Sequence, residues 1–209
     1  MTKKENINGN CFICGKKNTK IVMKNHIYKE HNDGTEKCYL IKAEGVYNKK
    51  YWLYFSMPLE ANLSVVDKFL RQIWCECCGH LSAFYIGGEG IGKSRKLYDF
   101  DPGEKLLYEY DFGTSTDIAI TIIDEISRPV QKEKISLIAR NEPLKTICAH
   151  CGKNADYMNV YDMEYTCDEC VGGAEYDDYL LPITNSPRSG ECGYTGECDK
   201  WTFKQVIHK

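Results

Sequence analysis

Three Cys-x-x-Cys pairs are the features of this 209-residue chain that most clearly predict chemistry. Two thiolates at this spacing can bind one metal ion from a tight turn, and the same spacing occurs in redox-active dithiols. The chain has twelve cysteines, and its first residues lack the apolar stretch of a secretory signal. We therefore expect a cytoplasmic, reducing location, where grouped cysteines bind metal more often than they form disulfides. The pairs are Cys11/Cys14, Cys148/Cys151 and Cys167/Cys170.

The two C-terminal pairs are separated by fifteen residues, which gives the pattern C-x2-C-x15-C-x2-C. This spacing is typical of zinc ribbons, in which two Cys-x-x-Cys turns share one tetrahedral ion. Because four thiolates leave the metal no open position for water or substrate, such a site is structural and not catalytic. A redox dithiol is the alternative interpretation. The pattern predicts Zn²⁺ bound by Cys148, Cys151, Cys167 and Cys170.

The N-terminal pair is followed by two histidines and reads C-x2-C-x11-H-x4-H. Residues 19–31 contain no Pro or Gly, so a helix there can present both imidazoles to one ion. The middle spacing is one residue shorter than the usual value of about twelve. An unrelated cysteine pair with surface histidines is the alternative. The pattern predicts a Cys2His2-like zinc finger with the ligands Cys11, Cys14, His26 and His31.

A third group of cysteines follows a predicted helix and lies around Cys77 and His80. These two residues have the two-residue gap of a metal-binding turn, and a further zinc could join them to Cys192 and Cys198 of the tail. A Cys–His nucleophile and buried apolar cysteines are the alternatives. The sequence leaves open the roles of the six cysteines outside the three pairs named above: Cys38, Cys75, Cys77, Cys78, Cys192 and Cys198.

The segment 87–94 matches the phosphate-binding pattern G-x4-G-K-[ST]. Lys93 would then contact the phosphates, Ser94 a metal ion, and Asp124 would supply a second metal carboxylate. A helix must follow the Lys for its N-terminus to hold the phosphates, but Pro102-Gly103 comes soon after and no helical pattern lies between. Glycines of a hairpin loop explain the segment more simply, and a nucleotide-binding enzyme stays the alternative function.

The net charge of −3 hides an uneven distribution. Residues 1–50 carry eleven Lys and five Asp or Glu, a balance of +6, so the remaining residues sum to −9. A basic N-terminal segment could contact nucleic acid or an acidic protein. The finger positions that would face bases are Thr19, Val22 and Asn25, and none is an Arg, so base specificity would be weak. No apolar run is long enough to span a membrane.

The pattern of apolar residues predicts an α+β fold in three segments: the finger over 1–34, a central mixed sheet-and-helix domain over 35–145, and the ribbon with a tail over 146–209. An amphipathic stripe predicts a helix over 64–74, with Val66, Phe69, Leu70, Ile73 and Trp74 facing the core. Alternating or β-branched runs predict the strands of the central domain. These strands lie near 38–44, 51–57, 81–86, 105–112, 117–124 and 134–139.

Two segments of the central domain resemble a known family. The run Leu107-Tyr-Glu-Tyr-Asp-Phe-Gly113 and the strand after it resemble the Y-x-Y-D-F-G signature of the Ri-plasmid ORF-three-like family. Trp74 and the run from His80 to Phe84 resemble its W…H-L-x-x-F segment, and residues 185–196 look like a motif of a zinc-ribbon subgroup. The resemblance covers about 38–140 and implies a compact α+β domain linked to plasmids and transposon passenger genes.

This chain also departs from that family. Residues 114–119 replace the D-x-W-x-H that usually follows, so no catalytic residue is transferred with the resemblance. We therefore expect a zinc-stabilised, non-enzymatic binding or regulatory protein, associated with mobile elements, whose basic finger contacts nucleic acid or an acidic partner. The sequence leaves the ligand, the pathway and the oligomeric state open.

Overall fold

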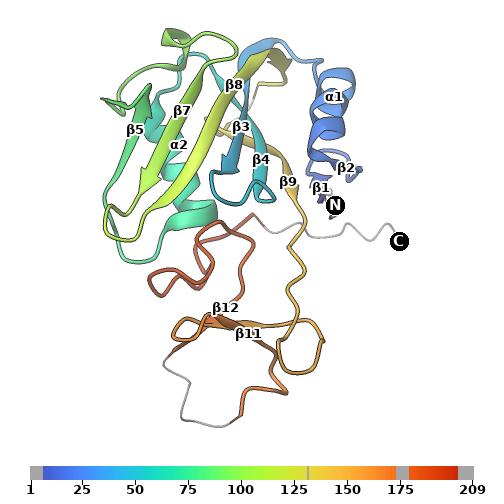
Figure 1. Ribbon diagram of the computed structural model, residues 1–209. Helices are drawn as coiled ribbons and strands as arrows, with labels where there is room; N and C mark the ends of the chain where they lie inside the picture. Colours follow the sequence, from blue (N-terminus) through green and yellow to red (C-terminus); the bar gives the residue numbers. More distant parts are fainter. Residues whose placement is uncertain (1–6, 131, 173–178, 202–209) are drawn as a thin grey trace.

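The computed structural model describes residues 7–130, 132–172 and 179–201. These residues form a nine-stranded antiparallel sheet and a separate three-stranded sheet below it (Figure 1). The order in the large sheet is β2-β1-β9-β4-β3-β8-β7-β5-β6. Its strands are β1 (Asn8–Cys11), β2 (Lys17–Thr19), β3 (Glu36–Gly45), β4 (Trp52–Pro58), β5 (Ser82–Ile86), β6 (Glu89–Ile91), β7 (Lys105–Tyr110), β8 (Thr116–Arg128) and β9 (Ser136–Asn141).

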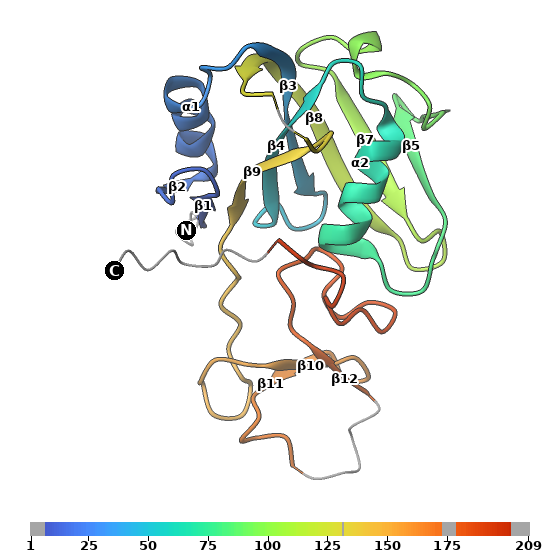
Figure 2. The same cartoon turned by 180° about the vertical axis from the view of Figure 1, so that it is seen from behind.

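The helix α2 (Leu63–Leu70) covers one face of this sheet, the face turned toward the viewer in Figure 2. It continues into a π-helical turn over Arg71–Cys75, and such turns are frequent at functional sites. All five residues of the predicted stripe are buried against the sheet. The helix prediction over 64–74 is therefore confirmed, with the last turn widened from α to π geometry.

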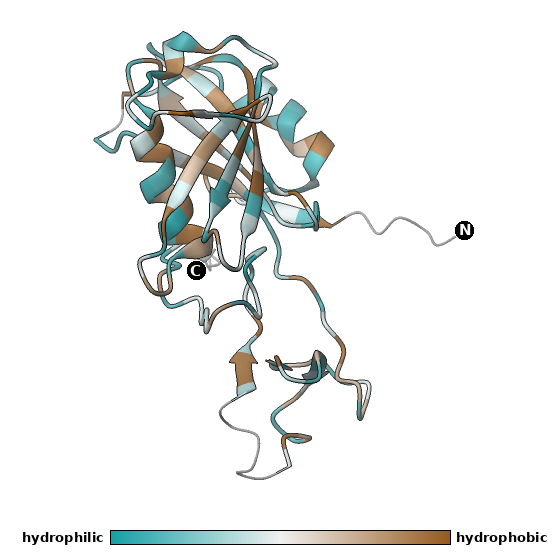
Figure 3. Ribbon diagram, turned by 60° about the vertical axis from the view of Figure 1, so that its left-hand side comes forward, coloured by the Kyte–Doolittle hydropathy of each residue, from teal (hydrophilic) through white to brown (hydrophobic). Residues whose placement is uncertain are grey.

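A second helix, α1 (Lys20–Glu30), packs on the opposite face through Met23 and Ile27. Side chains of a strand alternate between the two faces of its sheet. Accordingly Ile41 of β3 belongs to the core under α2, whereas its neighbour Leu40 belongs to the core under α1. Figure 3 shows hydrophobic residues along the strands of this sheet, because the central strands are buried on both faces.

The six predicted strands of the central domain are all present, so the mixed fold class holds. Strands dominate, however, and the described residues contain only two α-helices. The N-terminal residues extend the large sheet, since Gly9 of β1 pairs with Asn141 of β9. That pairing joins segments more than a hundred residues apart, and local sequence patterns do not specify such a partner.

The C-terminal part has two pieces. The small sheet has the order β11-β10-β12, from β10 (Tyr157–Asn159), β11 (Glu164–Thr166) and β12 (Leu180–Pro182). The chain then returns to the large domain, where the indole of Trp74 donates a hydrogen bond to the carbonyl of Asn185 at 3.1 Å. Ser186 Oγ donates in turn to the carbonyl of Trp74 at 2.6 Å.

Across the described ranges, no helix is long and apolar enough to cross a membrane.

Candidate metal centres

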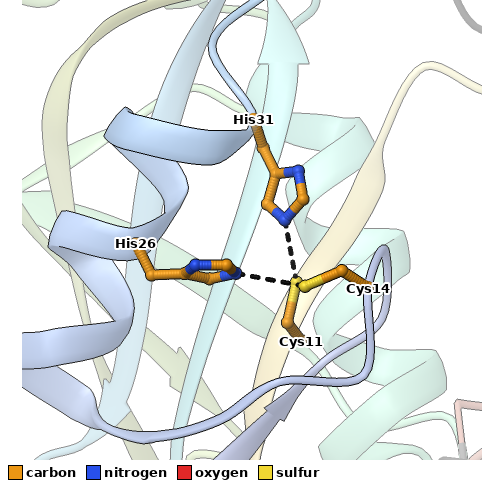
Figure 4. A group of neighbouring side chains, drawn as sticks. All are labelled: Cys11, Cys14, His26 and His31. Atoms are coloured by element: carbon orange, nitrogen blue, oxygen red, sulfur yellow. Dashed lines mark hydrogen bonds between the residues drawn. The ribbon is translucent and has the colours of Figure 1, made fainter.

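The N-terminal group is built by a tight turn and the helix that faces it. Cys11 ends β1, and the amide of Gly15 donates to the carbonyl of Cys11 at 2.8 Å, with Gly15 at φ +74°. Glycine suits this left-handed position because it has no Cβ. The turn thereby points the thiols of Cys11 and Cys14 toward His26, which lies on α1, and toward His31, which directly follows that helix (Figure 4).

The distances within this group fit one shared ion. Cys11 Sγ lies 3.4 Å from His31 Nε2, and Cys14 Sγ lies 3.2 Å from His26 Nε2. All four ligand atoms lie within 4.8 Å of one another. A thiolate and an imidazole nitrogen on one tetrahedral zinc ion are about 3.6 Å apart. The structure thus brings together the four residues named by the N-terminal pattern.

Both imidazoles of this group are held in the form that binds metal. Burial lowers the pKa of His26, and the neighbouring Lys16 lowers it further. Burial likewise lowers the pKa of His31, with contributions from His26 and Arg128. A lowered pKa favours the neutral imidazole, whose free nitrogen lone pair is the metal ligand.

The C-terminal group repeats the same turn. The amide of Gly152 donates to the carbonyl of Cys148 at 3.0 Å, and Gly152 has the φ of +74° seen at Gly15. The second turn places Cys170 beside Cys167, whose Sγ lies 3.6 Å from Cys151 Sγ. Two thiolates of one tetrahedral zinc ion are roughly 3.8 Å apart. The four predicted ribbon ligands therefore lie together, within 4.8 Å.

The thiols of this group need a cation to ionise together. Burial raises the pKa of Cys148, but backbone amides of His150, Cys151 and Cys167 outweigh burial and lower it to about 6. By contrast, hydrogen bonding with the thiols of Cys151 and Cys167 raises the pKa of Cys170 to about 12. Adjacent thiolates repel one another, and a bound metal cation removes that penalty because it binds them all as thiolates.

A third group contains Cys77, Cys78, His80 and Cys192, again within 4.8 Å. Its composition corrects the predicted set, because Cys78 takes the place of Cys198. The thiol of Cys198 points to the backbone, with Sγ 3.4 Å from the carbonyl oxygen of Arg71. The sequence signal that could have identified Cys78 as a ligand is its position directly after Cys77. The remaining two cysteines, Cys38 and Cys75, are buried in the two hydrophobic cores.

The glycine-rich segment forms a hairpin. Gly87 and Gly88, both at positive φ, make the turn between β5 and β6, as the hairpin interpretation predicted. Lys93 does not begin a helix, and its ammonium group contacts Asp67 at 3.1 Å and Ser82 Oγ at 2.7 Å.

The other two residues named for nucleotide binding add no phosphate site. Ser94 lies in the turn after β6, and Asp124 lies within β8, where its carboxylate accepts a hydrogen bond from the amide of Glu125. This segment therefore lacks the helix N-terminus on which phosphate binding depends.

The basic N-terminal surface is partly neutralised by acidic neighbours. Lys17 pairs with Glu142 and Lys20 with Glu44, both at 2.6 Å. A third pair joins Lys16 of the turn to Glu30 of α1 at 3.6 Å. Glu30 and Glu44 are already counted in the balance of +6, so among these pairs only Lys17–Glu142 lowers the net charge of the segment, but all three pairs occupy lysines that a ligand would otherwise contact.

Comparisons with known proteins add little to this geometry. No protein-family model matches the chain, and no curated protein matches it. Among solved structures, the chain is similar to a protein of unknown function from Methanosarcina mazei Go1. The two are 19% identical, the match covers 57% of this chain and 76% of the other, and the TM-score is 0.45. The comparisons therefore assign neither a family nor a function.

Proposed function

We propose that this is a zinc-stabilised binding protein in which the N-terminal group (Cys11, Cys14, His26, His31) and the C-terminal group (Cys148, Cys151, Cys167, Cys170) each hold a structural Zn²⁺ ion. The observation that carries the proposal is the convergence of two complete donor sets, one of two cysteines and two histidines and one of four cysteines, each with its atoms within 4.8 Å. Thiolate and imidazole sets of four are the usual ligands of structural zinc. Carboxylates, which calcium and magnesium require, are absent from both sets.

The same donor sets favour binding over catalysis. A catalytic zinc keeps one position for water or substrate, whereas each of these groups supplies four protein ligands. The metal then fixes the shape of a surface and does not react. The redox alternative uses a single pair of thiols, and it leaves unexplained why His26 and His31 face the N-terminal pair.

The contact surface that we propose is the exposed side of α1. Lys24 and Lys29 have no ion-pair partner among the described residues, and Ile21 and Val22 are 73% and 50% exposed. An acidic protein with an apolar contact matches this mixture of cations and exposed apolar groups. Nucleic acid draws much of its affinity from cations on its phosphates. Lys16, Lys17 and Lys20 of this region are already paired with carboxylates.

Elemental analysis of the reduced, purified protein tests the metal part of the proposal. Cys14→Ala and Cys151→Ala should each remove one zinc per chain, because each removes one ligand from a different group. Cys38→Ala, which removes a buried thiol outside the groups, should leave the zinc content unchanged. Zinc contents that are equal in all four proteins would contradict the proposal.

A separate experiment tests the contact surface. Binding partners captured with the wild-type protein should be lost with Ile21→Asp, since a charge there disrupts an apolar contact, and kept with Lys96→Ala on a distant loop. Tight binding of DNA or RNA that weakens steeply with added salt would instead favour the nucleic-acid interface.

A further inference from the structure

The third Cys/His group joins two parts of the chain that are distant in sequence. Cys77, Cys78 and His80 follow the π-helical turn after α2. Cys192 belongs to residues 185–194, the C-terminal segment that returns from the small sheet to the large domain. His80 Nε2 lies 3.2 Å from Cys192 Sγ, across a separation of 112 residues. The group therefore exists only when the C-terminal segment is docked on the large domain.

The backbone around this group is held in an unusual conformation. Three described non-glycine residues have positive φ, and two of them are here: Asp111 at 65° and Cys192 at 45°. Such conformations persist where the surroundings enforce them. At Cys192 this backbone turns the thiol toward His80.

Asp111 is the partner that orients the histidine. Its Oδ1 lies 3.4 Å from His80 Nδ1 and accepts the amide of Gly113 at 3.1 Å. Its Oδ2 accepts a hydrogen bond from Arg188 Nη2 at 2.7 Å. A carboxylate on one imidazole nitrogen sets the tautomer in which the other nitrogen is free to bind metal. His80 Nε2 is that second nitrogen, and it faces the thiol of Cys192.

Arg188 connects the ligand group to the docked segment. Its side chain is fully buried, and it donates to Thr116 Oγ1 at 2.9 Å as well as to Asp111. The same guanidinium lies 3.5 Å from Cys77 Sγ. Ligand, orienting carboxylate and buried cation thus belong to one network.

We propose that Cys77, Cys78, His80 and Cys192 bind a third Zn²⁺ ion, which fastens the C-terminal segment to the large domain. Asp111 is a positioning residue for His80, and Arg188 anchors the segment beside the ion. Three cysteines with one histidine are one of the usual structural zinc sets. Because binding requires the docked segment, the metal stabilises docking by its own binding free energy.

This third ion is also the most readily removed. Cys78 and Cys192 are exposed, whereas the N-terminal group has three buried ligands and the C-terminal group has two. The N-terminal and C-terminal groups have one exposed ligand each, whereas no ligand of the third group is buried, so a chelator reaches the third group with the least local opening. The third group should therefore lose its zinc first, and the docking of residues 185–194 should weaken with it.

Measuring the zinc content of variants distinguishes this ligand set from the set predicted from the sequence, which contains Cys198 in place of Cys78. Cys78→Ser and Cys192→Ser should each bind one zinc fewer than the wild-type protein. The matched control is Cys198→Ser, which removes a neighbouring tail thiol that bonds to the backbone and should keep the full content. Loss of zinc in Cys198→Ser with none in Cys78→Ser would overturn the proposed ligand set, and unchanged content in all three variants would overturn the site.

Hydrogen exchange supplies a readout of docking. The amides of Ser189, Glu191 and Tyr194 donate hydrogen bonds within the segment. In Cys192→Ser they should exchange at least about tenfold faster, while those of β8 keep their wild-type rates. Equal rates in the segment would refute the fastening role even if zinc were lost. Cys78→Ser and Cys192→Ser leave the ligands of the N-terminal and C-terminal groups intact, so their outcome is independent of Cys14→Ala and Cys151→Ala, which test those two groups.

Discussion

Cys170→Ala is expected to unfold the small three-stranded sheet while the nine-stranded sheet stays folded. The substitution removes one of four thiols that lie within 4.8 Å. The sheet has little else to stabilise it, because β10, β11 and β12 have three residues each. Met158 is the one large apolar residue that is buried in these strands, with 7% of its surface exposed.

The magnitudes favour the metal as the main source of order. Burial of a Met side chain contributes about 1.5–3 kcal/mol. Each net hydrogen bond between these short strands contributes about 1 kcal/mol. A structural zinc ion contributes about 10–16 kcal/mol at neutral pH in small zinc-binding peptides. The metal term therefore exceeds the other terms, and its loss should leave residues 146–172 without a stable fold.

Amide hydrogen exchange measures this loss strand by strand. Tyr157–Asn159 and Glu164–Thr166 should lose their protection in Cys170→Ala, while Ile118–Ile122 of β8 should keep it. Lys153→Ala is the matched control, because it removes an exposed ion pair with Glu169 and leaves all ligands in place. Full protection of β10 and β11 in a Cys170→Ala protein that has lost the zinc of this group would refute the reasoning, since the strands would then fold without that metal.

Three further predictions concern the large domain. Cys14→Ala should lower the free energy of unfolding through the loss of its zinc but leave α1 folded, because the burial of Met23 and Ile27, about 1.5–3 kcal/mol each, keeps that helix on the sheet. Circular dichroism during denaturation would show both effects. Lys93→Ala should leave ATP binding undetectable in calorimetry, as in the wild-type protein, because this lysine pairs with Asp67. Asp67→Asn should cost about 2 kcal/mol at pH 7. Burial raises the pKa of Asp67, but hydrogen bonds from Ser82, Lys93 and Tyr108 outweigh it and lower the pKa overall. The contribution of Asp67 is therefore present above its unfolded pKa of about 3.9 and disappears as the pH falls through the lower folded value. Urea denaturation of both proteins at pH 6 and pH 3 should show the difference shrinking in acid.

Local patterns in the sequence were sufficient where one element determines its own structure. The stripe of α2 follows the helical period, so its core-facing residues could be named in advance. The Cys-x-x-Cys turns are similarly local, and their spacing identified the ligands that the structure brings together. In both cases the residues that interact, or that form one turn, lie within a few positions of one another.

Contacts between distant segments were not accessible to the same reasoning. Cys192 and Cys198 lie at nearly the same distance from His80 along the sequence, so the sequence does not separate them as ligands. The backbone turn at Cys192, with φ at 45°, is what brings the Cys192 thiol to His80. The buried pair of Arg188 and Asp111 gave no sequence signal, because the two residues lie 77 positions apart. The pairing of β1 with β9 depends likewise on the completed sheet.

The consequence of losing a metal ion and the ease of losing it are set by different features of this protein. Ease follows ligand exposure, which is greatest in the third group. Consequence follows the apolar burial that remains, which is large beneath α1 and small in the three-stranded sheet. A stepwise chelator titration should therefore loosen residues 185–194 first, and the unfolding of β10 and β11 should follow at higher chelator concentration. The fold of the nine-stranded sheet should outlast both steps, because its two cores are formed by side chains alone.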